Sequence, residues 1–243
     1  MRTSTGLSLG LGLSGALLTA ALPVAAPVSS PCRALFGITD RLPDRSCVAL
    51  TFDDGPHPRG TPLVLDILAR AGIRATFFLV GEQVRRRPAL VSEMVAQGHE
   101  IGLHSYSHTA LVRLTPRALE REMDMSASAV GEAAGLSVRL FRPPRGIFTY
   151  SGLRQVRDRG WTPVLWAADG RDWRQRATPD GICERVARRL LGGNVILLHD
   201  SDFYGAHESW RNTAAALEPL LEQIEQRGLR AAAMTVESLR GAR

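Results

Sequence analysis

Two histidines, His104 and His108, stand four residues apart in a short polar segment of the sequence. On one helical turn this spacing would direct both imidazoles to the same side, which is a common way to hold a transition metal. Asp54 offers the carboxylate that such a pair lacks, and it follows another acid, Asp53. Two imidazoles and one carboxylate leave a coordination position open, as in catalytic zinc sites. The residue types therefore predict a hydrolytic metal centre, while a surface or core role remains the alternative for each histidine.

The two neighbouring aspartates predict two different roles at this centre. Adjacent side chains in a regular strand face opposite sides of the sheet. At a strand end the backbone turns, and Gly55 and Pro56 favour such a turn here. Both carboxylates can then reach one site, where Asp54 binds the metal and Asp53 stays free as a base. The alternative is a turn in which the acids only cap the backbone.

Apolar runs typical of strands alternate with helical stretches from about residue 47 onward. Because the strands are apolar on both faces, they predict a parallel sheet covered by helices, either a closed barrel or an open doubly wound sheet. No glycine-rich nucleotide loop follows the first strand, which disfavours a dinucleotide-binding fold. The expected strands are 48–52, 75–80, 100–103, 140–142, 163–167, 195–198 and 231–236. The expected helices are 61–71, 88–97, 116–134, 151–159, 179–191 and 213–227.

Ionisable residues follow nearly every predicted strand, and in β/α folds functional groups gather at the carboxyl ends of the strands. Arg142 precedes two prolines, so its loop is stiff and suits the orientation of a carboxylate. His199 follows a buried strand directly, and Asp172 is placed to hold one of its ring nitrogens. An ordinary salt bridge for Arg142 and a packed core position for His199 remain the alternatives.

Five short motifs occur in order along the chain and together resemble those of the polysaccharide deacetylases, carbohydrate esterase family four. This family includes the nodulation-type chitooligosaccharide deacetylases. The resemblance covers roughly residues 46–238. It implies a distorted (β/α) barrel of about seven parallel strands. It also implies a metal-dependent hydrolase that removes acetyl groups from N-acetylated or O-acetylated sugars. The motifs are Thr51–Pro56, His104–His108, Arg142–Gly146, Asp169–Trp173 and Leu197–His199.

The resemblance implies roles for the residues that match these motifs. Asp53 would be the general base that takes a proton from water, and His199 the general acid that protonates the leaving amine. One divalent ion is implied, zinc in most members, with cobalt or nickel as alternatives. Its implied ligands are Asp54, His104 and His108.

Further residues would support the reaction. The resemblance implies that Arg142 steadies Asp53 and that Asp172 steadies His199. It implies that Trp173 and Leu197 wall a small pocket for the acetyl methyl group. Many members carry an aromatic residue where this chain has Arg145, and the family uses the backbone N–H there for the oxyanion. We therefore expect that N–H to serve here too, with an arginine at the mouth of the site that favours anionic substrates.

Composition excludes several classes of protein. With 44% hydrophobic and 22% charged residues, the 243-residue chain is neither mostly disordered nor a polytopic membrane protein. Its 30 basic residues are all arginine and are scattered, so the formal net charge of +6 does not indicate nucleic-acid binding. We expect a monomer that acts on an acetylated polysaccharide or oligosaccharide, above all peptidoglycan or a related cell-wall glycan. The alternatives are a glycan-binding barrel without catalysis and a deacylase of a lipid-linked sugar.

Residues 1–31 predict an export segment. Arg2 precedes a charge-free apolar run from about residue 6 to 26, which is typical of a secretory signal peptide. An uncleaved anchor is the alternative, and only then would the chain contact a membrane. We expect residues 32–243 to form the catalytic domain, secreted or associated with the cell envelope.

The three cysteines fit an exported protein. In an oxidising compartment Cys32 and Cys47 could form a disulfide bond that ties the N-terminal arm to the first strand. Cys183 would then be left over, and we expect it to be a small buried hydrophobic residue on a helix.

Overall fold

The computed structural model describes residues 29–239. The expected signal peptide or anchor therefore lies outside the described residues, apart from its last three positions. None of the helices in the described range is long and apolar enough to cross a membrane. The range opens with a short helix, α2 (Ser30–Leu35), which the sequence patterns did not predict; the side chain of Ser29 caps its first turn.

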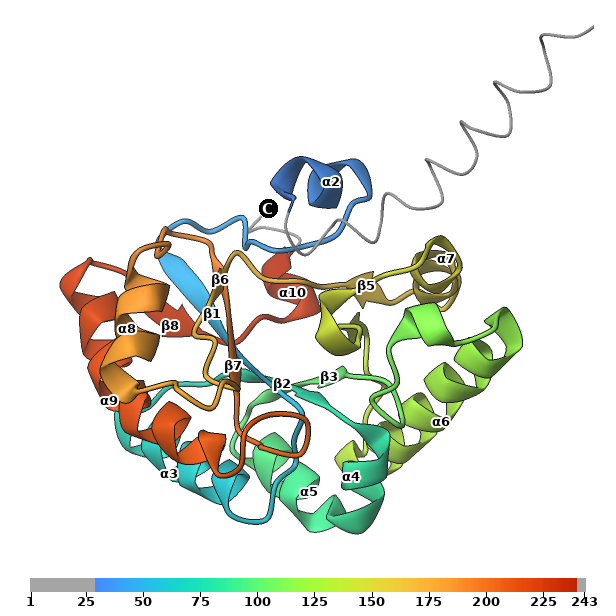
Figure 1. The fold of residues 1–243 in the computed structure, drawn as a ribbon, viewed down its shortest axis with the longest axis horizontal. Helices are drawn as coiled ribbons and strands as arrows, with labels where there is room; N and C mark the ends of the chain where they lie inside the picture. Colours follow the sequence, from blue (N-terminus) through green and yellow to red (C-terminus); the bar gives the residue numbers. More distant parts are fainter. Residues whose placement is uncertain (1–28, 240–243) are drawn as a thin grey trace, which may run out of the picture.

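Within residues 29–239, eight strands form one curved parallel sheet with helices around its outside (Figure 1). Their order is β5-β4-β3-β2-β1-β7-β6, and β8 pairs with the first half of β1. Because the edge strands β5 and β6 do not pair with each other in the described range, the barrel is open at that seam. The expected distorted (β/α) barrel is confirmed. The strands are β1 (Cys47–Asp53), β2 (Thr76–Leu79), β3 (Glu100–Leu103), β4 (Leu140–Phe141), β5 (Thr162–Pro163), β6 (Ala168–Asp169), β7 (Val195–His199) and β8 (Arg230–Ala232).

The prediction of one strand over 163–167 is wrong. Two strands form around this segment instead of one, so the sheet has eight strands in the described range and not the expected seven. The chain instead forms two short strands, β5 and β6, on either side of a linking segment. In that segment Leu165 donates its backbone N–H to the carbonyl of Thr39, whereas Ala167 donates to the carbonyl of Val195. The N-terminal arm at Thr39 and strand β7 thus divide the backbone hydrogen bonds between them, and one continuous strand cannot form.

The helices lie mainly where the sequence patterns predict them, with three short additions: α2, α4 and α10. Thr115 and Thr178 cap their helices as expected, each accepting a hydrogen bond from a backbone N–H of the first turn. Helix α9 begins four residues before its expected start, behind Glu208 in a left-handed conformation. The remaining helices are α3 (Gly60–Ala71), α4 (Gly81–Arg86), α5 (Pro88–Ala96), α6 (Pro116–Ala134), α7 (Tyr150–Asp158), α8 (Pro179–Ala187), α9 (Ser209–Gln226) and α10 (Val236–Leu239).

Thr61 does not cap α3, contrary to the pattern of threonine followed by proline. The helix begins one residue earlier, and the N–H of Gly60 donates to Nδ1 of the buried His57. The Thr61 hydroxyl is used elsewhere: it contacts the carboxylate of Asp200 and accepts the backbone N–H of His57. A histidine therefore caps this helix, and the threonine ties it to the end of β7.

Strand β1 lies at the centre of the fold and is buried along its whole length. It pairs with β2 on one side and with β7 on the other, and the Phe52 ring stacks on Phe77 at 5.1 Å between centroids. Burying apolar side chains on both faces stabilises such a strand by roughly 1.5–3 kcal/mol for each large residue. The end of β1 is therefore a rigid place from which to present side chains.

Cys47 is a buried thiol, so the considered disulfide between Cys32 and Cys47 does not form. The Cys47 sulfur instead lies 3.7 Å from the carbonyl oxygen of Asp44. Cys183 is buried on α8, as expected, and its thiol faces the carbonyl of Ala216 on α9.

Candidate metal centre and catalytic pocket

A cavity of about 190 Å³ lies at the carboxyl ends of the strands. Side chains from the ends of β1, β3 and β7 meet there with others from the loops after β4, β5, β6 and β7. The motif residues are thus brought together, although they come from segments far apart in the sequence. The lining residues are Asp53, Asp54, His104, His108, Arg145, Gly146, Trp166, Trp173, Leu197, His199 and Tyr204.

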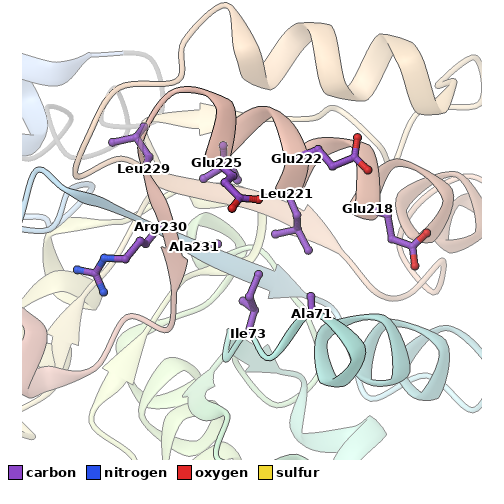
Figure 2. A pocket seen from close by; sticks show the side chains of 10 residues that line it. Ala71, Ile73, Glu218, Leu221, Glu222, Glu225, Leu229, Arg230 and Ala231 are labelled. Atoms are coloured by element: carbon purple, nitrogen blue, oxygen red, sulfur yellow. The ribbon is translucent and has the colours of Figure 1, made fainter.

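A larger groove, of about 580 Å³, lies between the end of α3, helix α9 and strand β8 (Figure 2). Its floor is apolar, with Ile73 and Leu221, and its rim carries Glu218, Glu222 and Glu225. No histidine or cysteine lines it, and none of the predicted site residues does. The predicted metal ligands, general base and general acid therefore lie in the smaller cavity.

Asp54, His104 and His108 form a buried group in which one ligand atom from each lies within 4.8 Å of the other two. Nε2 of His104 is 3.3 Å from Asp54 Oδ1, and Nε2 of His108 is 3.2 Å from the same oxygen. Asp54 leaves the strand direction with a φ of 76°, which turns its side chain onto the same side as Asp53. The two aspartates thus reach one site because the backbone turns at the strand end.

The donor set of this group fits a divalent cation. His104 Nδ1 lies 2.8 Å from the carbonyl oxygen of Arg142, so that nitrogen carries the proton and Nε2 is left with its lone pair. Burial lowers the pKa of His108 and favours the neutral imidazole that binds metals. Asp54 Oδ1 is buried and accepts no hydrogen bond from residues 29–239, which is the state expected of an oxygen that binds a metal.

The segment that joins the two histidines is a loop, so the helical turn expected from their spacing is wrong. Ser105 and His108 both have left-handed backbones, with φ values of 65° and 58°. Glu122, on α6, holds the loop from outside. Its carboxylate accepts hydrogen bonds from the N–H groups of Tyr106 and Ser107 and from the hydroxyls of Ser105 and Ser107, at 2.8–3.1 Å. The sequence carries no signal that would single out Glu122 among the acids of α6.

Asp53, at the end of β1, is held by Arg142. Nη1 of Arg142 lies 2.6 Å from Asp53 Oδ1 and also donates to the Thr51 hydroxyl. The guanidinium is fully buried, with its carbon 4.0 Å from the centre of the Phe78 ring. Burial lowers the pKa of Arg142, and the Asp53 charge opposes that shift. The free Oδ2 of Asp53 lies 3.7 Å from Nε2 of His104, so this carboxylate borders the three-residue group.

His199, at the end of β7, is held by Asp172. Its Nδ1 lies 3.0 Å from Asp172 Oδ1, and its backbone N–H donates to Oδ2 at 2.6 Å. Thr213, on α9, donates its hydroxyl to the same Oδ2 at 2.8 Å. Burial alone would lower the pKa of His199, but the charges of Asp172 and then Asp54 outweigh it and raise the pKa to about 10. The imidazole is therefore protonated at neutral pH in the protein as described.

The pocket walls include Trp173, Leu197 and Arg145, all named from the sequence, and the aromatic residues Trp166 and Tyr204. Trp173 meets the His199 ring edge-on at 5.1 Å between centroids. Tyr204 stacks on His108 at 3.7 Å with a 16° angle between the rings. Trp166, from the linking segment after β5, closes the pocket beside Gly146, where an added Cβ would lie 2.5 Å from its ring.

Asp200 is a further buried acid that sequence reasoning did not single out for a role. It follows His199 and contacts the Thr61 hydroxyl, while its Oδ1 has no hydrogen-bond partner in the described range. Burial raises its pKa to about 7, with the hydrogen bond from Thr61 opposing the shift. A Cβ on Gly55 would lie 2.7 Å from its carboxylate oxygens. The turn after Asp54 therefore requires a glycine because this carboxyl group packs against it.

Fold and site together define a β/α-barrel hydrolase with a place for one metal ion. Residues 40–164 match the family model described as polysaccharide deacetylase. A chitooligosaccharide deacetylase of Sinorhizobium fredii is 39% identical over 187 residues, which cover 74% of this chain and 86% of that protein. A peptidoglycan-N-acetylglucosamine deacetylase of Bacillus cereus is 35% identical over 196 residues, which cover 79% of this chain and 89% of that protein.

The crystal structure of a peptidoglycan N-acetylglucosamine deacetylase superposes with a TM-score of 0.79. The two chains are 28% identical, and the match covers 87% of this chain and 96% of that one. This chain belongs to the polysaccharide deacetylase family. The predicted membership of this family is thereby confirmed, and so is the expected enzyme class, a polysaccharide deacetylase hydrolase.

Proposed function

We propose that this enzyme holds one divalent cation, zinc in the first instance, and removes acetyl groups from N-acetylated sugars of peptidoglycan or a related cell-wall glycan. The observation that carries the proposal is the buried group of Asp54, His104 and His108 beside a second carboxylate held by an arginine. Two imidazoles and one carboxylate are the ligand set of open catalytic zinc sites, and cobalt and nickel accept the same ligands. An O-acetyl ester would suit the same groups.

Asp53 acts as the general base in this proposal. A cation at the three-residue group would polarise the acetyl carbonyl and make water more acidic. Arg142 occupies Oδ1 of Asp53 at 2.6 Å, which fixes the carboxylate and leaves Oδ2 toward the group. Oδ2 is therefore placed to take the proton of the attacking water. Such a positioned base contributes about 10²–10⁴-fold to the rate.

His199 acts as the general acid. The amine that leaves an amide needs a proton, and a protonated imidazole can supply it. Asp172 holds Nδ1 of His199, so Nε2 is the atom that faces the pocket and donates. Since Asp172 raises the pKa of His199, the proton is present at neutral pH.

Three residues complete the acetyl site. The backbone N–H of Arg145, in a left-handed residue with a φ of 61°, is the donor for the oxyanion that forms as water adds. Losing one such donor typically costs ~3 kcal/mol of transition-state stabilisation. Trp173 and Leu197 wall the space for the acetyl methyl group. A cavity of about 190 Å³ is smaller than pockets that enclose whole drug-sized ligands, so most of the sugar remains at the mouth.

Peptidoglycan is our first choice of substrate, and neutral chitooligosaccharides are the second. The relatives include proteins named for each. The formal net charge of +6 and the exposed Arg145 at the mouth favour the more anionic glycan. We also propose that residues 1–31 direct export, with residues 32–243 as the catalytic domain; N-terminal sequencing of the mature protein tests this.

The function is tested by acetate release from peptidoglycan, chitotetraose and acetyl-xylan, using protein loaded with Zn²⁺. We expect release from peptidoglycan, abolished by a chelator and restored by added zinc. Asp53→Asn serves as the matched inactive control, since Asn keeps the shape but cannot act as a base. Absence of acetate from all three substrates would refute the proposed activity. Release from acetyl-xylan alone would refute the proposed substrate class, the N-acetylated cell-wall glycans.

A further inference from the structure

A second cavity lies at the same edge of the barrel as the catalytic pocket, between the end of β6 and the start of α8. Its volume is about 280 Å³, and Gly170 and Thr178 form part of its lining. We name it the arginine cavity, after the four arginines that line it: Arg171, Arg174, Arg176 and Arg185.

The arginine cavity carries more positive charge than its own acids balance. Asp169 Oδ1 lies 2.9 Å from Nε of Arg185 and 3.7 Å from Nε of Arg171, so one carboxylate serves two guanidinium groups. The terminal nitrogens of both groups make no hydrogen bond to residues 29–239. The side chains of Arg174 and Arg176 form no ion pair within that same range. Guanidinium groups in this state are the usual partners of carboxylates and phosphates.

The loop that carries Arg171, Arg174 and Arg176 is held in place from outside the cavity. The Trp173 carbonyl accepts the N–H of Ala206, and the Ala177 carbonyl accepts the side-chain amide of Asn212 on α9. Inside the loop, Arg174 donates its N–H to the carbonyl of Arg171. A loop anchored at several points loses little conformational entropy when a ligand binds. The acid nearest the start of α8, Asp180, lies in its first turn and does not line the cavity.

The same loop forms one side of the catalytic pocket. Trp173 lines that pocket and Asp172 holds His199, while their neighbours Arg171 and Arg174 line the arginine cavity. Helix α8 packs against β6 (Figure 1). The cavity is lined by residues that follow β6 and by residues of α8. The catalytic pocket and the arginine cavity therefore border the same short loop.

We propose that the arginine cavity binds a carboxylate or phosphate group of the same glycan whose acetylated sugar occupies the catalytic pocket. This inference rests on the proposed function for its glycan and deepens it: the substrate is an anionic polymer, held at two points. Two anchoring points would fix the register of the chain and favour acetyl groups at a set distance from an anionic sugar.

The first test measures anion binding without catalysis. Calorimetry compares inorganic pyrophosphate and glucuronate binding to the full-length wild type, to Arg174→Gln/Arg176→Gln and to the matched control Arg139→Gln/Arg189→Gln. The control removes the same charge at the opposite end of the barrel, before β4 and β7. We expect wild type and control to bind equally and the cavity variant at least tenfold more weakly. Equal binding by all three proteins, or no binding, would overturn the proposal. The anion that binds tells phosphate from carboxylate.

The second test links the cavity to the substrate. Acetate release is measured on peptidoglycan strands, which carry carboxylates, and on neutral chitotetraose. We expect the cavity variant to lose about tenfold in kcat/KM on peptidoglycan and nothing on chitotetraose, with the control unchanged on both. An equal loss on both glycans, or no loss, would show that the arginine cavity does not bind an anionic group of the substrate. If the wild type releases no acetate at all, the proposed function fails, while the calorimetry still decides whether the anion site exists.

Discussion

Glu122 gives the sharpest test of how the fold prepares the histidine loop. Its carboxylate accepts four hydrogen bonds from residues 105–107, at 2.8–3.1 Å, and touches neither the cavity nor any ligand atom. In Glu122→Ala two backbone N–H groups lose their partner, and each such loss costs about 1–3 kcal/mol where the group is buried. Because the loop is half-buried, water replaces part of the lost hydrogen bonding. Removing an outer support of a metal ligand typically lowers affinity 10–100-fold, or about 1.4–2.8 kcal/mol.

We therefore expect Glu122→Ala to bind Zn²⁺ 10–100-fold more weakly in competition with a fluorescent chelator. Glu122→Gln keeps one acceptor oxygen and should lose less than tenfold. Glu120→Ala is the matched control, because this acid lies on the same helix, is exposed and has no side-chain hydrogen bond or ion pair in the described range. Should Glu122→Ala bind zinc as tightly as Glu120→Ala, the loop would not depend on the carboxylate and the reasoning would be refuted.

Four further outcomes follow from the site. Asp53→Asn should retain one metal ion per chain and lose at least ~100-fold in kcat; a near-normal rate would remove Asp53 from the chemistry. His104→Ala should retain no stoichiometric metal by elemental analysis, and a full equivalent would defeat the ligand assignment. Asp172 raises the pKa of His199, so Asp172→Asn should move the alkaline limb of the kcat/KM profile to lower pH; an unmoved limb contradicts this. Gly146→Ala places a Cβ 2.5 Å from an indole ring at a φ of 70°, so we expect lower activity and a lower Tm, and unchanged values would mean that the ring moves freely.

The raised pKa of His199 also predicts how the stability of the fold depends on pH. The folded-state pKa of His199 is about 10, above the unfolded value near 6.5. A group shifted in this direction stabilises the fold fully below its unfolded pKa, and that contribution is lost as pH rises toward the folded pKa. Metal-free protein should therefore lose stability between about pH 6.5 and pH 10 in denaturant titrations. Asp172→Asn should flatten this slope.

The alternation of strands and helices could be predicted from the sequence because burial forces a local pattern on each element. Thr115 and Thr178 show this at the level of single residues, since a capping hydroxyl acts within its own turn. Thr61 shows the limit: the same local pattern is overridden by Asp200, which is distant in sequence and takes the hydroxyl. The strand expected over 163–167 fails for a similar reason, because the N-terminal arm competes for its hydrogen bonds.

The residues of the site also fall into two groups: those that could be predicted from the sequence and those that could not. Asp53, Asp54, His104 and His199 stand at or just past strand ends, so the topology alone brings them to one edge of the barrel. Residues that act through tertiary contacts carry no sequence signal of their own. Their positions depend on how distant segments pack, as for Glu122 and Trp166.

The central claim is that one divalent cation is held by Asp54, His104 and His108, and an anomalous-scattering map of zinc-loaded crystals tests it most directly. We predict a single strong zinc peak, in contact with one oxygen of the aspartate and with Nε2 of both imidazoles. A zinc peak at any other set of side chains, or none in crystals grown with saturating zinc, would contradict the account.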